Sequence, residues 1–350
     1  MSVTVRLLAE APDGAAEAWD RFVHATDAAS FFHLAPWARV IERSFGHATH
    51  YAYAEEGGAI TGVLPLARMK TALFGDLLAS TPFCVYGGPV AVTEAAKDAL
   101  VAHAEALQKR LGAPVLEFRR IEAADQGFLD RPPLYYTFRK SIVITGDDVK
   151  DQERNIPRKQ RAEVRKGFKK GLTSVSNGDI ATLHRVYAES VRNLGSPVFP
   201  RRYFQALADA FPGAHDVTTV LHEGAPVASV LNFHFREQVL PYYGGGTFAA
   251  RGLSANEVMY WEVMRRAGAE RGATLFDFGR SKAGTGAFAF KKNFGFEPEQ
   301  LHYCYRLGPG ASIPDNNPNN PKYKAMIALW KRMPVWLANI LGPPLVRGLG

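Results

Sequence analysis

Asp277 lies in surroundings that favour acid–base chemistry. The strand-like segment ATLFDFG at 273–279 surrounds it with apolar residues, where an ionised carboxylate needs a partner. Arg280 or Lys282, which follow in the chain, would supply that partner in a structural salt bridge. Alternatively, Asp277 orients or deprotonates an attacking amine as a general base. Both interpretations remain open, and Asp277 is a candidate catalytic residue.

The segment after Asp277 supplies cations and hydroxyl groups that suit a polar substrate. Its sequence GRSKAGTG places Thr285 after Gly284, where a phosphate-binding Walker A motif needs Lys, so that motif is excluded. The GxSxG turn of serine hydrolases is also missing. The candidate substrate-binding residues are Arg280, Ser281, Lys282 and Thr285.

Lys291 is the second candidate catalytic residue, because FKKNFGF at 290–296 places it between aromatic residues. A lysine held there neutralises a negative tetrahedral intermediate or a phosphate, unless it is solvated at the surface. No metal site is predicted, because the HxxH pair His47 and His50 has neither a Cys partner nor the HExxH spacing.

A run of glycines lies upstream of both candidates. YYGGG at 242–246 ends a predicted strand, and its glycines let the backbone approach a ligand or splay from a neighbouring strand. Ser254 is the predicted N-cap of the next helix, and Glu257 completes a capping box. Free N–H groups at such a helix start bind a phosphate or an oxyanion, although an ordinary capped helix fits the same residues. The candidate donor-binding residues here are Tyr243, Gly244, Gly245, Gly246, Arg251 and Ser254.

The elements that position these residues occur twice in the chain. GAPVLEFRR at 112–120 and GATLFDFGR at 272–280 share Gly, Ala, an acid, Phe and Arg in one register, and YGG at 86–88 parallels the later glycine run. Helix-like segments at 32–46 and 199–213 also correspond. Hairpin-like segments with Gly-containing turns follow them, at 51–66 and 219–233. Each copy therefore reads helix, hairpin, strand, helix, strand.

This repeat predicts an α/β (α+β) fold made by tandem duplication of one domain, each copy a mixed twisted sheet flanked by helices. A chain of 350 residues with 47% hydrophobic residues can bury two sizeable cores. The predicted parts are an N-terminal domain at 1–150, a basic linker helix at 151–172, a C-terminal domain with the candidate site at 173–307, a linker at 308–321 and a basic apolar tail at 322–350.

The sequence also predicts a cytoplasmic location. Its start lacks the basic and apolar regions of a signal peptide, and no uncharged apolar stretch is long enough to span a membrane. The two cysteines, Cys84 and Cys304, are expected to be free buried thiols in a reducing compartment.

Positive charge is concentrated at 154–170, where eight basic residues accompany one acid, Glu163. Pro157 suits the start of a helix that places Arg158, Arg161 and Arg165 on one face. This helix is either a solvated linker or a docking strip for the phosphates of a nucleotide, a tRNA or a membrane lipid.

The tail is apolar, basic and interrupted by proline. After the Pro- and Asn-rich linker, residues 322–350 contain Trp330 and Trp336 together with Lys331 and Arg332. The tail either packs back onto a domain or lies in a membrane interface, with the tryptophans as anchors and the cations toward lipid headgroups. The second alternative predicts peripheral contact with the inner membrane.

The order strand, glycine turn, helix, strand resembles the acyl-CoA-binding core of the GNAT N-acyltransferases, and two such copies in tandem resemble the FemAB family. More narrowly, YYGGG, DFGRSKxGTG and FKKNFGF resemble the FemAB-related proteins associated with the exosortase and PEP-CTERM sorting system. The resemblance covers nearly the whole chain. The FKK segment is similar to the family's Phe-Lys pair, so the resemblance gives Phe290 a donor-binding role and places Lys291 near the transferred carbonyl.

This resemblance implies transfer of an acyl or aminoacyl group to an amine. The donor is then acyl-CoA or aminoacyl-tRNA as a co-substrate, with no tightly bound cofactor. The acceptor is an amine-bearing saccharide or peptidoglycan precursor of the cell envelope or an exopolysaccharide. The long coiled-coil insertion frequent in tRNA-using Fem proteins is missing here, and the PEP-CTERM-associated branch is linked to exopolysaccharide production. The resemblance therefore makes an amino sugar or a lipid-linked saccharide a credible acceptor.

Two other functions remain open at this level. One is a non-catalytic adaptor that holds polysaccharide or protein-sorting machinery at the membrane surface through the basic helix and the tail. The other is a nucleic-acid binder, which the net charge of +8 would permit. The basic residues, however, lack the aromatic interleaving of RNA-binding platforms.

Overall fold

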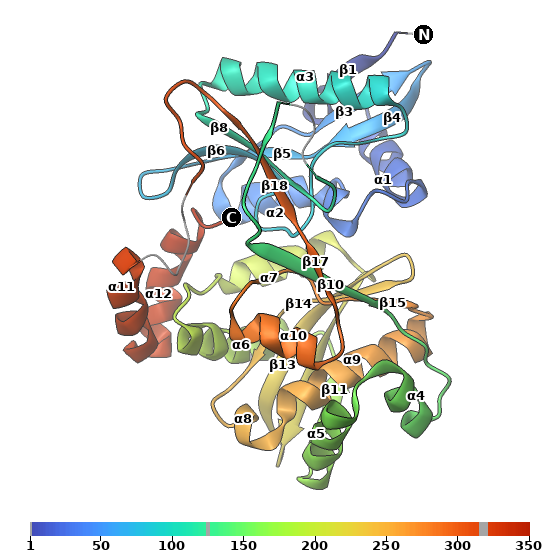
Figure 1. Cartoon of the computed structure of the whole chain (residues 1–350), viewed down its shortest axis with the longest axis vertical. Coiled ribbons are helices and arrows are strands. Elements are labelled where there is room, and N and C mark those ends of the chain that lie inside the picture. The colour runs from blue at the N-terminus through green and yellow to red at the C-terminus, as the bar shows by residue number, and fades with distance from the viewer. Residues whose placement is uncertain (1, 124–126, 315–320) are drawn as a thin grey trace. The chain divides into compact units, whose positions relative to one another are not determined.

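The computed structural model describes residues 2–123, 127–314 and 321–350, which form two compact units (Figure 1). Unit 1 comprises Met1–Leu134, Gln300–Asn317 and Arg347–Gly350. Unit 2 comprises Tyr135–Glu299 and Pro318–Val346. Each unit is thus assembled from segments that are distant in the sequence.

Unit 1 contains short strands and three α-helices among its described residues. Its elements are β1 (Thr4–Leu7), α1 (Ala15–Ala25), α2 (Pro36–Phe45), β2 (Ala48–Thr49), β3 (Ala52–Glu56), β4 (Ala59–Leu64), β5 (Leu66–Thr71), β6 (Gly75–Ser80), β7 (Val90–Ala91), α3 (Glu94–Leu111), β8 (Val115–Arg120), β9 (Leu129–Asp130) and β18 (His302–Leu307). They form a sheet of order β1-β3-β4-β7 and a sheet of order β2-β5-β6-β8-β18-β9, in which only β6 and β8 pair in parallel.

Unit 2 contains one large sheet. Its elements are β10 (Tyr135–Ser141), α4 (Asp148–Asn155), α5 (Arg158–Lys169), β11 (Thr173–Ser176), α6 (Ile180–Leu194), α7 (Arg201–Ala210), β12 (His215–His222), β13 (Ala225–Phe235), β14 (Gln238–Gly246), α8 (Ala250–Leu253), α9 (Ala255–Arg271), β15 (Leu275–Asp277), β16 (Ser281–Lys282), α10 (Gly286–Asn293), β17 (Pro298–Gln300), α11 (Pro321–Arg332) and α12 (Val335–Val346). The strand order is β11-β12-β13-β14-β15-β10-β16, and β17 pairs with β10.

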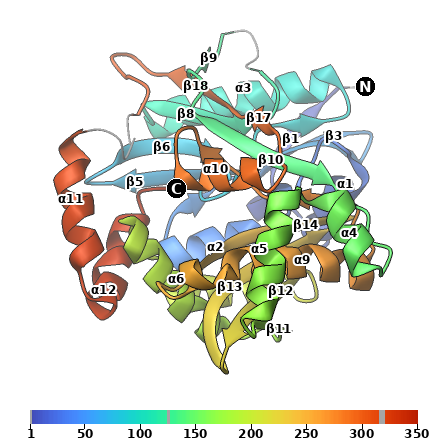
Figure 2. The same cartoon turned by 60° about the horizontal axis from the view of Figure 1, so that its bottom comes forward.

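Helices cover the sheet of unit 2. The helix α9 packs against β12, β13 and β14, α6 packs against β13 and β14, and α5 lies across α9 (Figure 2). A Cβ atom on Gly167 of α5 would come within 2.5 Å of Val258, so glycine permits the close approach of α5 to α9. Because α9 is covered by both the sheet and α5, it buries apolar side chains on more than one face, including Met259, Trp261 and Met264.

The two units share part of a strand order, because β6-β8-β18-β9 in unit 1 corresponds to β14-β15-β10-β16 in unit 2. In each unit the strand that follows the parallel pair comes from a distant part of the chain. In unit 1, β18 pairs antiparallel with β8, with Tyr303 opposite Arg119 (Figure 1). In unit 2, β10 takes the same place beside β15, with Arg139 opposite Asp277. The boundaries of the two units therefore differ from those of the predicted domains at 1–150 and 173–307. The reason is that β10 and β18 satisfy their hydrogen bonds in the sheet of the other copy.

The helices follow their sequence signals. Thr93 begins α3 by accepting a hydrogen bond from the Ala96 N–H at 3.1 Å, and Gly112 ends it in a left-handed conformation. The predicted correspondence of 32–46 with 199–213 appears as α2 and α7, and the predicted basic helix appears as α5. The hairpins appear as β3–β4 and β12–β13.

One predicted correspondence is wrong. Tyr86, Gly87 and Gly88 lie outside the strands, whereas the glycine run of the second copy is the end of β14. The parallel partner of β8 is instead β6, which no glycine pattern marks. Gly87 has a different reason for being glycine, since a Cβ there would come within 2.8 Å of Ser80.

The described part of the tail packs back as two helices. Both α11 and α12 lie against α6 in unit 2, and the Trp330 side chain is buried. Across the three described ranges, no helix has the length and apolar character needed to cross a membrane. The predicted linker at 308–321 lies partly outside the described residues, and Cys84 and Cys304 are both buried in unit 1.

Candidate active site

The strands β14 and β15 run together for only two residues and then separate. They pair in parallel at Gln238 with Leu275 and at Val239 with Phe276, whereas β14 continues to Gly246 alongside β13. An extra residue, Tyr242, interrupts the register between β14 and β13, and such a bulge bends a strand. The described pairings therefore leave the second half of β14 without a partner on the β15 side.

The predicted glycine turn is a strand, and its glycines face protein atoms at close range. A Cβ on Gly245 would lie 2.1 Å from the Ser190 hydroxyl of α6, and one on Gly244 would lie 2.6 Å from Val230. A Cβ on Gly246 would lie 2.6 Å from Ala250. Glycine is needed at these positions because neighbouring elements approach the strand closely.

Tyr243 belongs to an aromatic cluster that includes residues of α6 and α7. Its hydroxyl lies 2.8 Å from that of Tyr203, and its ring contacts Tyr187, Phe199 and Phe204. Burial raises the pKa of Tyr187 well above its usual value. Sequence reasoning missed Tyr187 and Tyr203, although the aromatic start of the segment at 199–213 indicated an apolar face there.

Ser254 does not cap α9, so the predicted capping box is wrong. Its backbone is left-handed, with φ of 59°, and its hydroxyl donates to the Glu163 carboxylate of α5 at 2.6 Å. Hydrogen bonds from Ser254 and then Lys166 lower the pKa of Glu163. The hydroxyl of Ser254 thus joins α5 to the start of α9.

Arg251 is exposed on α8, close to the end of the basic helix. The Lys170 ammonium donates to the Gly252 carbonyl at 2.5 Å, which ties this region to α8. The exposed side chains that we define as the basic surface are Lys166, Lys169, Lys170 and Arg251.

Asp277 is the last residue of β15, and only 2% of its surface is exposed. Its Oδ1 accepts a hydrogen bond of 2.7 Å from the Gly279 N–H, which orients the carboxylate. Arg280 and Lys282 stay the predicted cation partners of Asp277, and the Arg280 guanidinium also lies over the Tyr135 ring at 5.4 Å. The Lys291 ammonium is a further cation whose charge interacts with Asp277.

Lys291 faces the protein backbone. Its ammonium donates to the carbonyl oxygens of Phe278, Gly279 and Arg280 at 2.6, 2.9 and 3.0 Å. Burial lowers the pKa of Lys291 to about 7, and the three carbonyl acceptors favour the protonated form. Lys291 therefore holds the turn after Asp277, and its place near a transferred carbonyl stays a prediction.

The other predicted residues of this segment differ in their roles. Thr285 caps α10, because its hydroxyl accepts from the Phe288 N–H and donates to the Lys282 carbonyl at 2.7 Å. Ser281 is buried, and its hydroxyl has no hydrogen-bond partner among the described residues. The ring of Phe290 packs against Tyr260, whose pKa burial raises to about 12.

The structure therefore brings the predicted residues together in two groups at the separation of β14 and β15. The first group lies at the end of β15, which is Asp277, and Arg280 and Ser281 follow it in the chain. The Lys291 ammonium bonds the Arg280 carbonyl, and the Phe290 ring packs against Phe278. Tyr243 and the glycines lie on β14, and Arg251 and Ser254 lie just beyond it. A buried, oriented carboxylate suits proton transfer more than binding of a free anion.

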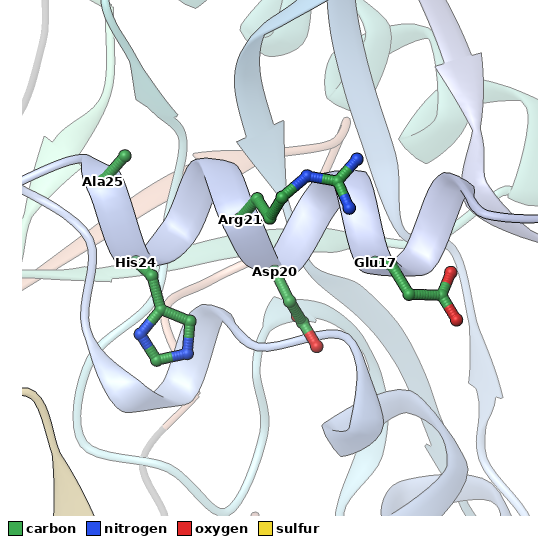
Figure 3. A pocket seen from close by; sticks show the side chains of 5 residues that line it. All are labelled: Glu17, Asp20, Arg21, His24 and Ala25. Atoms are coloured by element: carbon green, nitrogen blue, oxygen red, sulfur yellow. The ribbon is translucent and has the colours of Figure 1, made fainter.

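A hollow on the surface lies elsewhere, on α1 of unit 1 (Figure 3). It has a volume of about 540 Å³ and is lined by Glu17, Asp20, Arg21, His24 and Ala25. A single helix supplies all of these residues, and Asp20 is already used as an acceptor for the Ala35 N–H. None of the predicted site residues lines this hollow.

Comparison with known proteins supports the fold. The family model of the acetyltransferase (GNAT) domain matches residues 155–292. The structure of FemX is similar, with a TM-score of 0.67 at 16% identity over 87% of this chain and 97% of that chain. No curated protein sequence matches the chain.

Two further structures show the same likeness. A tandem GNAT protein from the clavulanic acid biosynthesis pathway gives a TM-score of 0.55 at 14% identity, over 89% of this chain and 100% of that chain. The C-terminal domain (DUF2156) of a putative lysylphosphatidylglycerol synthetase from Agrobacterium fabrum also gives 0.55 at 14% identity, over 84% and 92%. The predicted tandem GNAT-like fold is confirmed.

Proposed function

We propose that this chain is an N-acyltransferase of the FemAB type, which moves an acyl or aminoacyl group from an activated donor to an amine. The observation that carries the proposal is the separation of β14 from β15 with a buried, oriented carboxylate, Asp277, at its edge. The match to the GNAT acetyltransferase domain supports it, because that match spans both strands.

In this proposal the amine nitrogen attacks the donor carbonyl carbon while Asp277 takes its proton, directly or through a water. The tetrahedral intermediate then breaks its bond to the leaving sulfur or oxygen, which receives a proton in turn. Backbone N–H groups of β14 on its unpaired side would bind the oxyanion. The role of Lys291 is to position this carboxylate by holding residues 278–280.

The proposed donor is acyl-CoA or aminoacyl-tRNA, and both carry phosphates. The basic surface lies just beyond the glycine end of β14 and offers four exposed cations to those phosphates. The exposed ring of Phe248, between β14 and α8, lies in the same stretch of chain and can stack on a base. Donor binding is therefore expected to weaken as salt concentration rises.

The proposed acceptor is an amine-bearing saccharide or peptidoglycan precursor of the cell envelope. The resemblance of the motifs DFGRSKxGTG and FKKNFGF to the PEP-CTERM-associated branch implies a role in exopolysaccharide production, which we include in the proposal. A peptidoglycan bridge transferase that uses aminoacyl-tRNA is the alternative within the same chemistry.

A donor screen tests the proposal. The full chain is incubated with acetyl-CoA, longer acyl-CoAs or a pool of charged tRNA, each with glucosamine or a lipid-linked amino sugar as acceptor. Donor binding is measured by thermal shift, and a donor at one hundred times its Kd should stabilise the protein by about 2.7 kcal/mol. Mass spectrometry of the acceptor measures transfer. A protein that binds no donor and modifies no amine would instead be the non-catalytic adaptor.

A further inference from the structure

Exposed apolar side chains gather on the two helices of the tail. Leu329 on α11 is 67% exposed, and Trp336 and Ile340 on α12 are 64% and 61% exposed. Met326 and Leu341 add further apolar surface on the same helices. Large apolar side chains that stay in water over two adjoining elements mark an interaction surface.

The geometry of α12 explains why these side chains face outward. Ala338, Gly342 and Val346 are buried, and a Cβ on Gly342 would lie 2.6 Å from the Val198 backbone. Trp336 and Ile340 follow the same four-residue spacing on the opposite side of the helix. The face of α12 with the small side chains therefore packs on the rest of unit 2, and the face with Trp336 and Ile340 is exposed to solvent.

The charge of the tail has one sign. Residues 321–350 contain no acidic residue and five basic ones, of which Lys331 and Arg332 are exposed at the end of α11. Two copies of this face would bring like charges together. An anionic surface would instead neutralise these positive charges. The aliphatic stems of lysine and arginine would at the same time lie along apolar surface.

We propose that Leu329, Trp336 and Ile340, with Lys331 and Arg332, dock this protein on an anionic lipid bilayer. The helices lie in the interface and do not cross it, because α12 has only 12 residues and contains Pro343 and Pro344. The structure confirms that the tail packs on unit 2 (Figures 1 and 2), and in this proposal Trp336, but not the buried Trp330, serves as the lipid anchor.

The tryptophans make this docking directly observable. Trp336 is exposed, whereas Trp19, Trp37, Trp261 and Trp330 are each at most 5% exposed. Vesicles of phosphatidylcholine with phosphatidylglycerol should therefore shift the emission of Trp336 to shorter wavelength, and brominated lipids should quench it. A Trp336→Phe variant should lose both signals. Vesicles of phosphatidylcholine alone should give neither signal at the same lipid concentration.

Substitutions on the exposed face should weaken co-sedimentation of the full chain with anionic vesicles. We expect Leu329→Ser combined with Ile340→Ser to reduce partitioning at least tenfold. Neutralising Lys331 and Arg332 to Gln should reduce it roughly thirtyfold. The matched control is Leu73→Ser, because Leu73 is 74% exposed in unit 1, outside the tail, and its replacement should leave partitioning unchanged.

Two results would overturn the proposal. One is equal partitioning of the wild type and the tail variants, or the absence of Trp336 quenching on anionic vesicles. The other is a concentration-dependent dimer, detected by light scattering, that Leu329→Ser and Ile340→Ser convert to monomer, since the face would then belong to a second copy. Transfer to a soluble acceptor is measured in parallel and does not depend on either result.

Discussion

Asp277 combines burial with a fixed orientation, and these two properties define what it can do. The Gly279 N–H holds one carboxylate oxygen, while Lys291 acts on the group electrostatically from α10. The turn between them is rigid, because the Lys291 ammonium bonds three consecutive carbonyl groups. A base held in this way loses little freedom when it accepts a proton.

Asp277→Asn should therefore abolish transfer while leaving the protein folded. The Asn side-chain oxygen can still accept the Gly279 N–H, so the substitution removes charge and basicity but keeps the turn. We expect kcat to fall by about 100-fold or more with KM for the donor nearly unchanged. Steady-state kinetics measure this, and full activity in the variant would remove Asp277 from the mechanism.

His33 makes the stability of unit 1 depend on pH. The side chain is 2% exposed, its Nδ1 lies 3.1 Å from the Ser30 N–H, and burial lowers its pKa from 6.5 to about 4. Between these values the unfolded chain binds a proton that the folded chain does not. The free energy of unfolding should thus fall by up to about 3 kcal/mol as pH decreases from 6.5 to 4.

The variant His33→Asn isolates this contribution, because the Asn oxygen can accept the Ser30 N–H but does not titrate. Urea denaturation of both proteins across this pH range should show a smaller loss for the variant. If the free energy of unfolding falls equally with pH in both proteins, groups other than His33 set the pH dependence.

Residue types alone predicted the burial of Asp277 but did not reveal the protein partners of Lys291 and Ser254. The apolar strand around Asp277 predicts burial, which the structure shows. Lys291 and Ser254 were assigned to a ligand because sequence spacing does not reveal where a long side chain points or which distant element approaches. The partners that decide their roles are the turn at 278–280 and Glu163, and both are set by tertiary packing.

At the scale of elements, the bulge at Tyr242 and the glycines after it have different structural roles. The bulge bends β14, and the glycines keep the bent strand in contact with β13 and α6. The sequence predicted most helices and the hairpins, because alternating and helical apolar patterns are local. It could not predict that β14 pairs with β15 for only two residues, because pairing depends on atoms outside the strand.

Gly245→Ala should destabilise unit 2 by about 1–3 kcal/mol, because the new methyl group would overlap the Ser190 side chain. Ser190→Gly removes both atoms that the methyl group meets, at a helix cost of about 1 kcal/mol. The double variant should therefore be more stable than the sum of the two single effects predicts. Additive effects in this cycle would show that α6 does not constrain Gly245.

At the scale of the whole molecule, each unit is completed by a strand that the predicted boundaries give to the other. Beside β8, β18 contributes the buried side chains of Tyr303, Cys304 and Tyr305, and its Arg306 bonds Glu105 of α3. The duplicated order of elements was readable from repeated motifs. The exchange of strands could not be predicted from the sequence, because β10 and β18 keep the same apolar alternation whichever sheet they join.

A fragment of residues 1–134 should therefore fail to fold cooperatively. It lacks β18, so β8 becomes an open edge and β9 loses its partner. Joining residues 300–314 to residue 134 through a Gly/Ser linker should restore a cooperative urea transition, measured by circular dichroism. Cooperative folding of 1–134 by itself would show that β18 is dispensable.

The position of β18 also has a consequence for synthesis of the protein. The edge of β8 is translated about 180 residues before its partner β18, so at 5–20 residues per second the strand waits roughly 10–40 s. Throughout that interval a nascent chain exposes an unpaired, apolar strand edge, which other chains can join. The second sheet of unit 1 can therefore close only after β18 has been translated, and we expect chaperone supply to govern the yield of the protein in a cell.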